Sequence, residues 1–252
     1  MIDSARTLIC RDYSVFDQPC SNVFNIGLQV FEILFQDENC LVIEKPSGMS
    51  VLRDRDGSPN VFDTIREEFR EAKLVHRLDK GTSGVMVVAL TKEFQAFASR
   101  QFARRHIRKF YIAVISGHVA KGRTLTVELP LNPGRKGRYR VAGLREEIRT
   151  QRDGWSIDSS DGHPSTTRIR TLELGRNRTA VTLQPLSGRT HQLRVHMAWI
   201  GHSIVGDGLY GVPESSEQSW RRLLLHSTRV CIDSKYSFTS RPPKEFQEAL
   251  RL

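Results

Sequence analysis

The chain has 252 residues, of which 38% are hydrophobic, and a formal net charge of +10 at pH 7. This length and apolar content exclude a disordered or low-complexity protein and fit one large domain or two halves that share a cleft. No apolar run approaches the roughly 18 residues that span a bilayer, and the first residues lack the pattern of a signal peptide. We therefore expect a cytoplasmic protein with no membrane partner, and the basic balance favours nucleic acid as its partner.

Residues 1–30 show no clear periodicity, and their role stays open. From residue 31 onward, the short apolar segments 33–35 and 41–43 flank a polar turn and predict a β-hairpin that enters a loop at 44–48. Asn60 is a good N-cap for a helix over 61–69, whose apolar residues share one face. We interpret this helix as part of the scaffold.

The decapeptide VHRLDKGTSG at 75–84 precedes the apolar run 85–90. A polar turn that opens directly into a buried strand presents its side chains at the edge of a sheet, which makes Asp79 a candidate reactive group. Asp, Gly, Thr and Ser are also ordinary turn formers. The residues of this segment alone therefore favour a functional and a structural interpretation about equally.

Thr91 can cap a helix with an apolar face, and the end of that helix is rich in Arg and Lys. Cations stabilise a helix C-terminus, but four Lys or Arg within 104–110 exceed that need and favour contact with phosphate. Residues 110–116 predict a strand in which Tyr111 shares a face with Ala113 and Ile115. A tyrosine in such a position is most often a packed core aromatic.

Residues 134–140 and 145–153 are polar and basic, and we expect mobile loops that follow a phosphate backbone. Residues 165–174 and 178–186 alternate as two strands around a turn at 175–177. Thr190 can cap a helix behind Arg189, and a guanidinium at a helix N-terminus is a natural anion site. The glycine-rich loop 201–211 lacks the P-loop pattern. A short strand at 223–226 and a helix after 241–243 complete the predicted elements.

Neither a metal site nor a disulfide framework is indicated. The four cysteines, Cys10, Cys20, Cys40 and Cys231, form no C-x-x-C pair, and we interpret them as free thiols. His191 and His196 lie close in sequence, but no carboxylate completes a metal-binding pattern.

Three motifs taken together resemble the RluA family of pseudouridine synthases. They are H-R-L-D-x-x-T-S-G at 76–84, K-x-Y at 109–111 and G-R-T-H-Q-L-R-V-H at 188–196. Further matches are E-K-P-S-G at 44–48, G-H-S-I-V-G-D-x-x-Y at 201–210 and L-L-H-S at 224–227, so the resemblance runs from about residue 33 to about 243. Glu44 and Ser203 depart from the family pattern, in which asparagine and proline are more usual.

The resemblance implies an α+β fold with a mixed, mainly antiparallel central sheet in two halves, flanked by helices and loops, with the active-site cleft between the halves. It makes residues 31–252 a catalytic domain without the S4 RNA-binding module of many relatives, and residues 1–30 an extension. It implies no cofactor, no metal and no protein partner. We expect a monomer that modifies rRNA, tRNA or both.

The resemblance also implies roles for individual residues. Asp79 matches the catalytic aspartate, Tyr111 the tyrosine that stacks on the target base, and Arg189 the arginine that pairs with the aspartate. Arg77 matches an arginine placed to enter the RNA stack when the nucleotide leaves it. Further expected RNA contacts are His76, Arg104, Arg105, Arg108, Lys109, His191 and Arg194.

The chemistry of uridine isomerisation is compatible with a single carboxylate. The N1–C1′ bond breaks, the base turns and C5 joins C1′, so no redox or phosphate cofactor is needed. The carboxylate can attack C1′ or C6, or assist glycal formation by proton abstraction, and the sequence leaves these routes open.

Two other functions are weighed against this one. A non-catalytic RNA-binding protein on the same scaffold would be expected to lack Asp79, Tyr111 or Arg189, and all three are present. A nucleoside or glycoside hydrolase mostly needs two cooperating carboxylates. Glu44 and Asp207 lie in glycine-rich loops, where we interpret them as structural.

Overall fold

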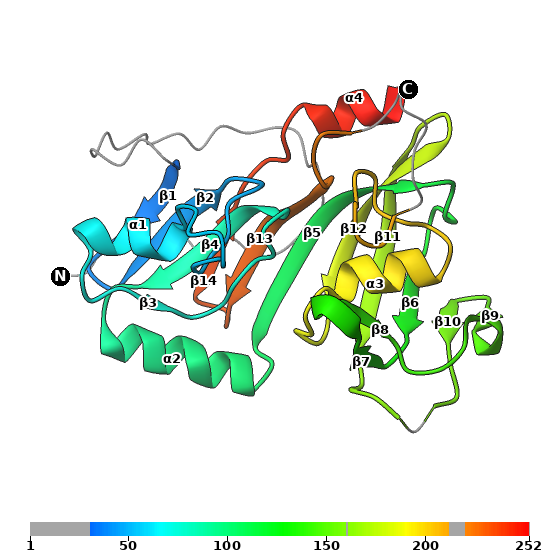
Figure 1. The fold of residues 1–252 in the computed structure, drawn as a ribbon, viewed down its shortest axis with the longest axis horizontal. Helices are drawn as coiled ribbons and strands as arrows, with labels where there is room; N and C mark the ends of the chain where they lie inside the picture. Colours follow the sequence, from blue (N-terminus) through cyan, green and yellow to red (C-terminus); the bar gives the residue numbers. More distant parts are fainter. Residues whose placement is uncertain (1–30, 160, 212–219, 252) are drawn as a thin grey trace.

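The structure is a computed structural model that describes residues 31–159, 161–211 and 220–251, so the predicted extension 1–30 lies outside the described residues. Twelve strands form one sheet (Figure 1), with the order β1-β2-β4-β13-β5-β12-β11-β6-β10-β9, while β3 pairs with β4 and β14 with β13. The β4–β13 and β6–β10 pairs are parallel, and the other pairs in this sheet are antiparallel. The predicted mixed, mainly antiparallel α+β fold is therefore confirmed.

The N-terminal half of the sheet contains β1 (Ile33–Gln36), β2 (Cys40–Lys45), β3 (Lys73–Leu74) and β4 (Ser83–Ala89). The predicted hairpin is the antiparallel pair β1–β2. Helices α1 (Val61–Glu68) and α2 (Lys92–Ala103) start at the predicted caps, where the side chains of Asn60 and Thr91 accept backbone hydrogen bonds. Local capping chemistry was sufficient to place these two helix starts.

The other half contains β5 (Ile107–Ser116), β6 (Thr124–Glu128), β9 (Arg149–Gln151), β10 (Gly154–Ser156), β11 (Thr166–Leu174), β12 (Arg178–Pro185), β13 (Leu225–Ile232) and β14 (Tyr236–Thr239). Strands β11 and β12 form the predicted hairpin. Helices α3 (Gln192–Trp199) and α4 (Glu245–Arg251) pack on this half.

The two faces of β5, β11 and β12 are covered differently. Tyr111 and Leu183 belong to the largest apolar cluster, to which α3 contributes Met197. On the opposite face, Ile112 packs in a smaller cluster with Phe246 of α4. Side chains alternate between the faces of a strand, so Tyr111 of the K-x-Y motif and helix α3 lie on the same side of the sheet.

The two halves of the sheet meet where β4 runs beside β13. Only two residue pairs, Ser83 with His226 and Gly84 with Ser227, form this parallel contact. Gly84 has φ +111, and a Cβ there would lie 2.3 Å from the carbonyl oxygen of Ser227. The final glycine of the H-R-L-D-x-x-T-S-G motif is therefore required for the two backbones to approach.

Several predicted elements need correction. The segment 134–153, predicted as loops, contains short 3₁₀ turns, strand β9 and the second strand of a small sheet made by β7 (Leu131–Pro133) and β8 (Tyr139–Val141). Helix α3 has His191 rather than Thr190 at its N-cap, with φ 55 and no side-chain cap bond. Strand β13 extends well beyond the predicted 223–226.

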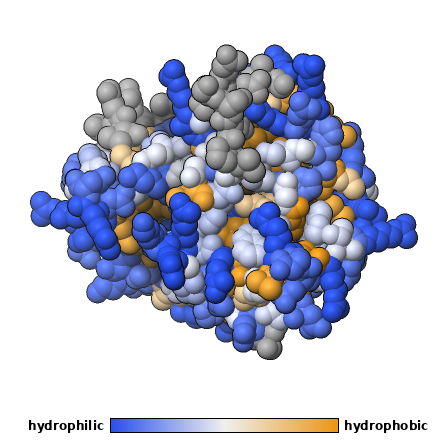
Figure 2. All heavy atoms as spheres, turned by 45° about the vertical axis from the view of Figure 1, so that its right-hand side comes forward, coloured by the Kyte–Doolittle hydropathy of each residue, from blue (hydrophilic) through white to orange (hydrophobic). Residues whose placement is uncertain are grey.

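The surface is mainly hydrophilic in Figure 2, with apolar side chains in patches between the polar ones. No described helix is long and apolar enough to cross a membrane.

Candidate active site

A cavity of about 170 Å³ lies between the β3–β4 turn, β5 and the start of α3. Its walls bring together segments that are far apart in sequence, and Asp79, Tyr111 and Arg189 all line it. Asp79 is the only carboxylate among its lining residues. The three motifs that carry the family resemblance therefore converge on one cavity.

Asp79 lies in the turn that leads into β4, and its side chain is 23% exposed. The backbone N–H of Thr82 donates to the Asp79 carbonyl oxygen and closes the turn at 3.0 Å. The E-K-P-S-G segment at 44–48 makes two hydrogen bonds to this turn. The Gly48 N–H donates to the Lys80 carbonyl at 2.8 Å, and the Ser47 hydroxyl donates to the Gly81 carbonyl at 2.7 Å. The position of the Asp79 turn therefore depends on both the H-R-L-D-x-x-T-S-G and the E-K-P-S-G motifs.

Lys45 is completely buried under the same turn. Its Nζ donates to the carbonyl oxygens of Pro46, Met49 and Lys80 at 2.7, 2.6 and 3.3 Å. Burial lowers the pKa of Lys45 to about 8, although the nearby charge of Asp79 opposes the shift.

The arginine that pairs with the Asp79 carboxylate is Arg194, not Arg189. Arg194 Nη1 lies 3.9 Å from Asp79 Oδ2, and the rest of the guanidinium grips Asp207 through Nε to Oδ2 at 2.8 Å and Nη2 to Oδ1 at 2.6 Å. Both residues of this pair are buried. Asp207 therefore holds the guanidinium in place while one edge of it faces Asp79.

Arg189 is exposed at the rim of the cavity, and its guanidinium forms no ion pair with a described residue. The expected Arg189–Asp79 pair is thus replaced by Arg194–Asp79. Both arginines belong to the G-R-T-H-Q-L-R motif. Arg194 lies within α3 and is buried, whereas Arg189 precedes the helix and is exposed. A signal existed in the sequence, because a buried arginine needs a counter-charge and Asp207 is the only acidic residue in the glycine-rich loop 201–211.

His191 approaches the same carboxylate oxygen as Arg194, with its Nε2 3.9 Å from Asp79 Oδ2. Its Nδ1 makes a 2.8 Å hydrogen bond with the Tyr210 hydroxyl, which also accepts the N–H of Tyr139 at 2.8 Å. Burial is the main cause of a lowered pKa for His191. The ring is thus held beside Asp79 by the loop 201–211 and by β8.

Lys109 and Tyr111 reach the cavity from β5. Burial lowers the pKa of Lys109, and the charge of Asp79 opposes this shift, while burial raises the pKa of Tyr111. The Lys109 Nζ also lies 5.6 Å from the centre of the Phe102 ring of α2. Only 7% of Tyr111 is exposed, and the residue lines the cavity.

The other expected RNA contacts divide into two groups. Arg77, Arg104, Arg105 and Arg108 are exposed and available to phosphate. His76 and Arg194 instead make their contacts inside the protein, since the His76 Nε2 accepts the Val87 N–H at 2.9 Å and Arg194 binds Asp207. Burial lowers the pKa of His76 to about 3, so this ring is neutral.

Glu44, the residue that departs from the family pattern, is a half-buried carboxylate beside the seam between the halves of the sheet. Its Oε2 is buried without a hydrogen-bond partner, and its Oε1 lies 3.8 Å from His226 Nδ1. Burial and Arg222 lower the pKa of His226 to about 3, so this histidine is neutral. Burial, and to a smaller extent Glu32, raise the pKa of Glu44 to about 7, against Ser240 and Arg222, which lower it.

This shift predicts a pH-dependent gain in stability for Glu44→Gln. The pKa of about 7 in the folded protein lies above the ordinary glutamate value of 4.5, so the folded protein binds more protons within that window and loses stability as the pH rises through it. We expect Glu44→Gln to raise the free energy of unfolding by up to about 3 kcal/mol above pH 7 and by little below pH 4.5. Urea unfolding at several pH values measures this difference. A gain of equal size at pH 4.5 and pH 8 would contradict the assignment.

No group of three or more His, Cys, Asp and Glu side chains in the described ranges is arranged to hold a metal ion. The ionisable residues that line the cavity are Arg77, Asp79, Lys109, Tyr111, Arg189, His191 and Arg194.

Comparison with known proteins identifies the family. The model of the RNA pseudouridylate synthase family matches residues 39–199. A dual-specificity RNA pseudouridine synthase RluA from Yersinia pestis is 37% identical over 202 residues, which cover 79% of this chain and 91% of the relative. The chain belongs to the RluA family of RNA pseudouridine synthases. RluA of Escherichia coli K12 is similarly 36% identical over 220 residues, or 85% of this chain and 93% of the relative.

Solved structures agree with this family assignment. Human RNA pseudouridylate synthase domain containing 4 superposes with a TM-score of 0.71 at 25% identity, covering 86% of this chain and 91% of the human one. Human RNA pseudouridylate synthase domain containing 1 gives a TM-score of 0.70 at 26% identity, with 90% and 89% covered. The fold and the isomerase activity expected from the sequence motifs are therefore confirmed at the level of the RluA family.

Proposed function

We propose that this RluA-family enzyme uses Asp79 to isomerise uridines in structured rRNA, tRNA or both. The observation that carries the proposal is that Asp79 is the sole carboxylate in a cavity that also holds Tyr111. The RluA relatives are named dual-specificity enzymes, which supports rRNA and tRNA as two substrate classes. We further propose, from the family resemblance, that the enzyme acts as a monomer on these cytoplasmic RNAs.

The cavity suits a uridine that has left its RNA stack. Extruding a base costs a few kcal/mol, and stacking on an aromatic ring recovers about 1–3 kcal/mol. With the base on Tyr111, the Asp79 carboxylate can act on C1′ or C6, or take a proton to form the glycal. Arg194 places a positive charge beside that carboxylate, and its ion pair with Asp207 holds the guanidinium in position.

Release of tritium from RNA labelled at uridine C5 tests the function, because C5 loses its hydrogen when it joins C1′. We expect the purified enzyme to release tritium from total rRNA or tRNA without added metal or nucleotide. Mapping of pseudouridine in the treated RNA then identifies the site. Failure to release tritium from either RNA class would overturn the proposal.

Substitutions of Tyr111 test the stacking role. Tyr111→Phe keeps the aromatic face and should bind substrate RNA within about twofold of wild type, whereas Tyr111→Leu keeps most of the volume but should lose about 1–3 kcal/mol of binding free energy. Binding is measured by fluorescence anisotropy, with thermal unfolding as a check that both variants fold. Equal losses in the two variants would remove stacking as the explanation.

A further inference from the structure

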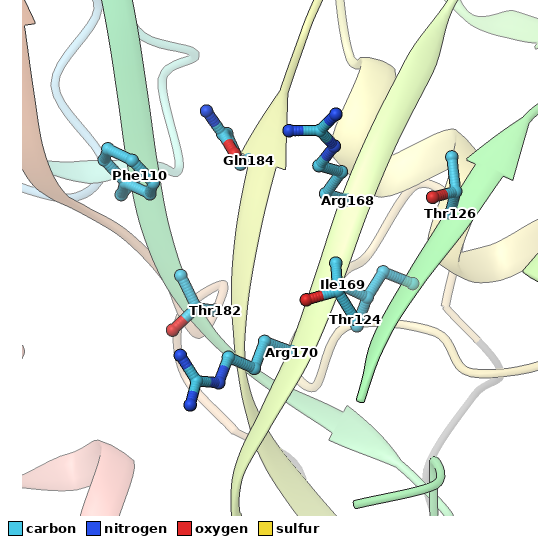
Figure 3. Close-up of a pocket in the computed structure, with 8 residues that line it drawn as sticks. All are labelled: Phe110, Thr124, Thr126, Arg168, Ile169, Arg170, Thr182 and Gln184. Carbon is cyan, nitrogen blue, oxygen red and sulfur yellow. The ribbon is translucent and has the colours of Figure 1, made fainter. Parts of the chain in front are cut away.

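A second, larger concavity lies on the other face of the same sheet. It measures about 440 Å³ and is formed by β5, β12, β11 and β6. Its lining residues are Phe110, Thr124, Thr126, Arg168, Ile169, Arg170, Thr182 and Gln184 (Figure 3). The floor is a pleated sheet, and the side chains that stand on it are hydroxyls, an amide, two guanidiniums and one aromatic ring.

Strand alternation separates this concavity from the catalytic cavity. Thr167 contacts α3, since its hydroxyl bonds His196 Nδ1 at 2.9 Å, and its neighbour Arg168 points to the opposite face. Tyr111 likewise lines the catalytic cavity, whereas Phe110 lines the second concavity. Across the strands, Arg168 pairs with Gln184 on one side and with Thr126 on the other, which places these three side chains in one row.

No helix of the described chain covers this row. The α4 cluster takes in Ile112 and Ala180 further along β5 and β12, but not Phe110 or Gln184. Arg168 is exposed, and its guanidinium makes no hydrogen bond or ion pair with a described residue. Arg229 adds a basic residue at the margin of this face, because it pairs with Phe110 across β13 and β5, while Glu128 at the end of β6 is acidic.

The two cavities meet at one edge of the sheet. In β5, Lys109 and Tyr111 line the Asp79 cavity, while Phe110 between them lines the second concavity. At the end of β12, Pro185 lines the Asp79 cavity and Gln184 lines the second concavity. The exposed Arg104, Arg105 and Arg108 connect the end of α2 to the start of β5 at this edge. A chain of phosphates that leaves the Asp79 cavity past these arginines arrives at the row of Arg168.

We propose that this row, Phe110, Thr126, Arg168 and Gln184, is a second RNA-binding surface that holds backbone phosphates of the substrate outside the loop that carries the target uridine. Exposed guanidiniums and threonine hydroxyls donate to phosphate and ribose oxygens, and Phe110 offers a face to an unpaired base. The inference rests on the proposed function, and it explains how a catalytic domain can gain affinity for a large folded RNA. The partner is recognised by its backbone, so the surface adds affinity rather than sequence choice.

The test compares two transcripts: a stem-loop that the wild-type enzyme modifies, and a longer RNA that contains it. Wild type should show a steeper dependence of log affinity on log salt for the longer RNA. Arg168→Gln should bind the longer RNA several-fold more weakly and reduce its salt slope by about 0.7–0.9, the value of one phosphate contact. Arg176→Gln, which removes the same charge from the exposed turn at the other end of the β11–β12 hairpin, is the matched control.

The outcomes separate the possibilities. Pseudouridine formation in the stem-loop by wild type is measured first, so a wrong function is recognised before the variants are compared. Equal salt slopes of wild type for the two transcripts would assign the face to a partner other than RNA and overturn the proposal. Equal losses in Arg168→Gln and Arg176→Gln would also overturn it, because they would show only the effect of net charge.

Discussion

Asp79→Asn should reduce pseudouridine formation by about 10³-fold or more, since a neutral amide neither attacks carbon nor accepts a proton. The substitution keeps the shape of the side chain. It also keeps the backbone bond between the Thr82 N–H and the Asp79 carbonyl, so the turn should fold as before. Tritium release measured at saturating RNA reports the loss, and unchanged RNA affinity would show that the cavity is intact.

The matched control for this result is Asp158→Asn. Asp158 is 86% exposed and forms only a surface pair with Arg149 at 3.6 Å, so its loss should leave the rate within about twofold of wild type. Undiminished tritium release by Asp79→Asn would contradict the assignment of Asp79 as the reacting carboxylate. The reacting group would then lie outside this cavity, because no second carboxylate lines it.

The second large effect is expected at the buried pair of Arg194 and Asp207. Asp207→Asn retains an oxygen for the N–H groups of Leu209 and Tyr210, which Asp207 Oδ1 accepts at 2.9 and 3.1 Å, but it leaves the guanidinium without its bidentate partner. Breaking one side of a buried pair costs about 3–5 kcal/mol. For a chain of this size that corresponds to a fall in Tm of about 6–20 °C, which circular dichroism measures.

A double variant separates stability from catalysis at this pair. Arg194→Met in the Asp207→Asn background removes the uncompensated charge, so part of the lost stability should return. Activity should remain low, because no guanidinium then faces Asp79. If the Tm of Asp207→Asn equals that of wild type, the Arg194–Asp207 pair contributes nothing to stability. If the double variant regains activity together with stability, the arginine is only structural.

The elements that could be predicted were those with local signals. Asn60 and Thr91 cap their helices as expected, and the turn at 175–177 joins β11 to β12. Strands β6, β9 and β10 went unpredicted because they are short and lie toward one edge of the sheet, where pairing with distant segments matters more than their own apolar pattern. The left-handed His191 shows the same limit at a helix start, since tertiary contacts with Tyr210 hold it there.

The site was predicted in part for a comparable reason. Motif residues Asp79 and Tyr111 were assigned from the family resemblance, and the structure places both at one cavity. The choice between Arg189 and Arg194 needed the orientation of α3 relative to the sheet, which depends on packing between segments far apart in sequence. For His76 the family resemblance suggested an RNA contact, which stays a prediction, while the structure shows its Nε2 accepting the N–H of Val87 in β4.

Hydrogen bonds from the segment 45–48 order the Asp79 turn in the free protein. Lys45, Ser47 and Gly48 fix the carbonyls of Lys80 and Gly81, so the turn has lost its conformational freedom before any RNA arrives. Ordering one residue costs about 1–2 kcal/mol of entropy, and here that cost belongs to folding. Under the proposed function, the interaction energy of the RNA is therefore left for drawing the uridine out of its stack, because the Asp79 turn is ordered before the RNA binds.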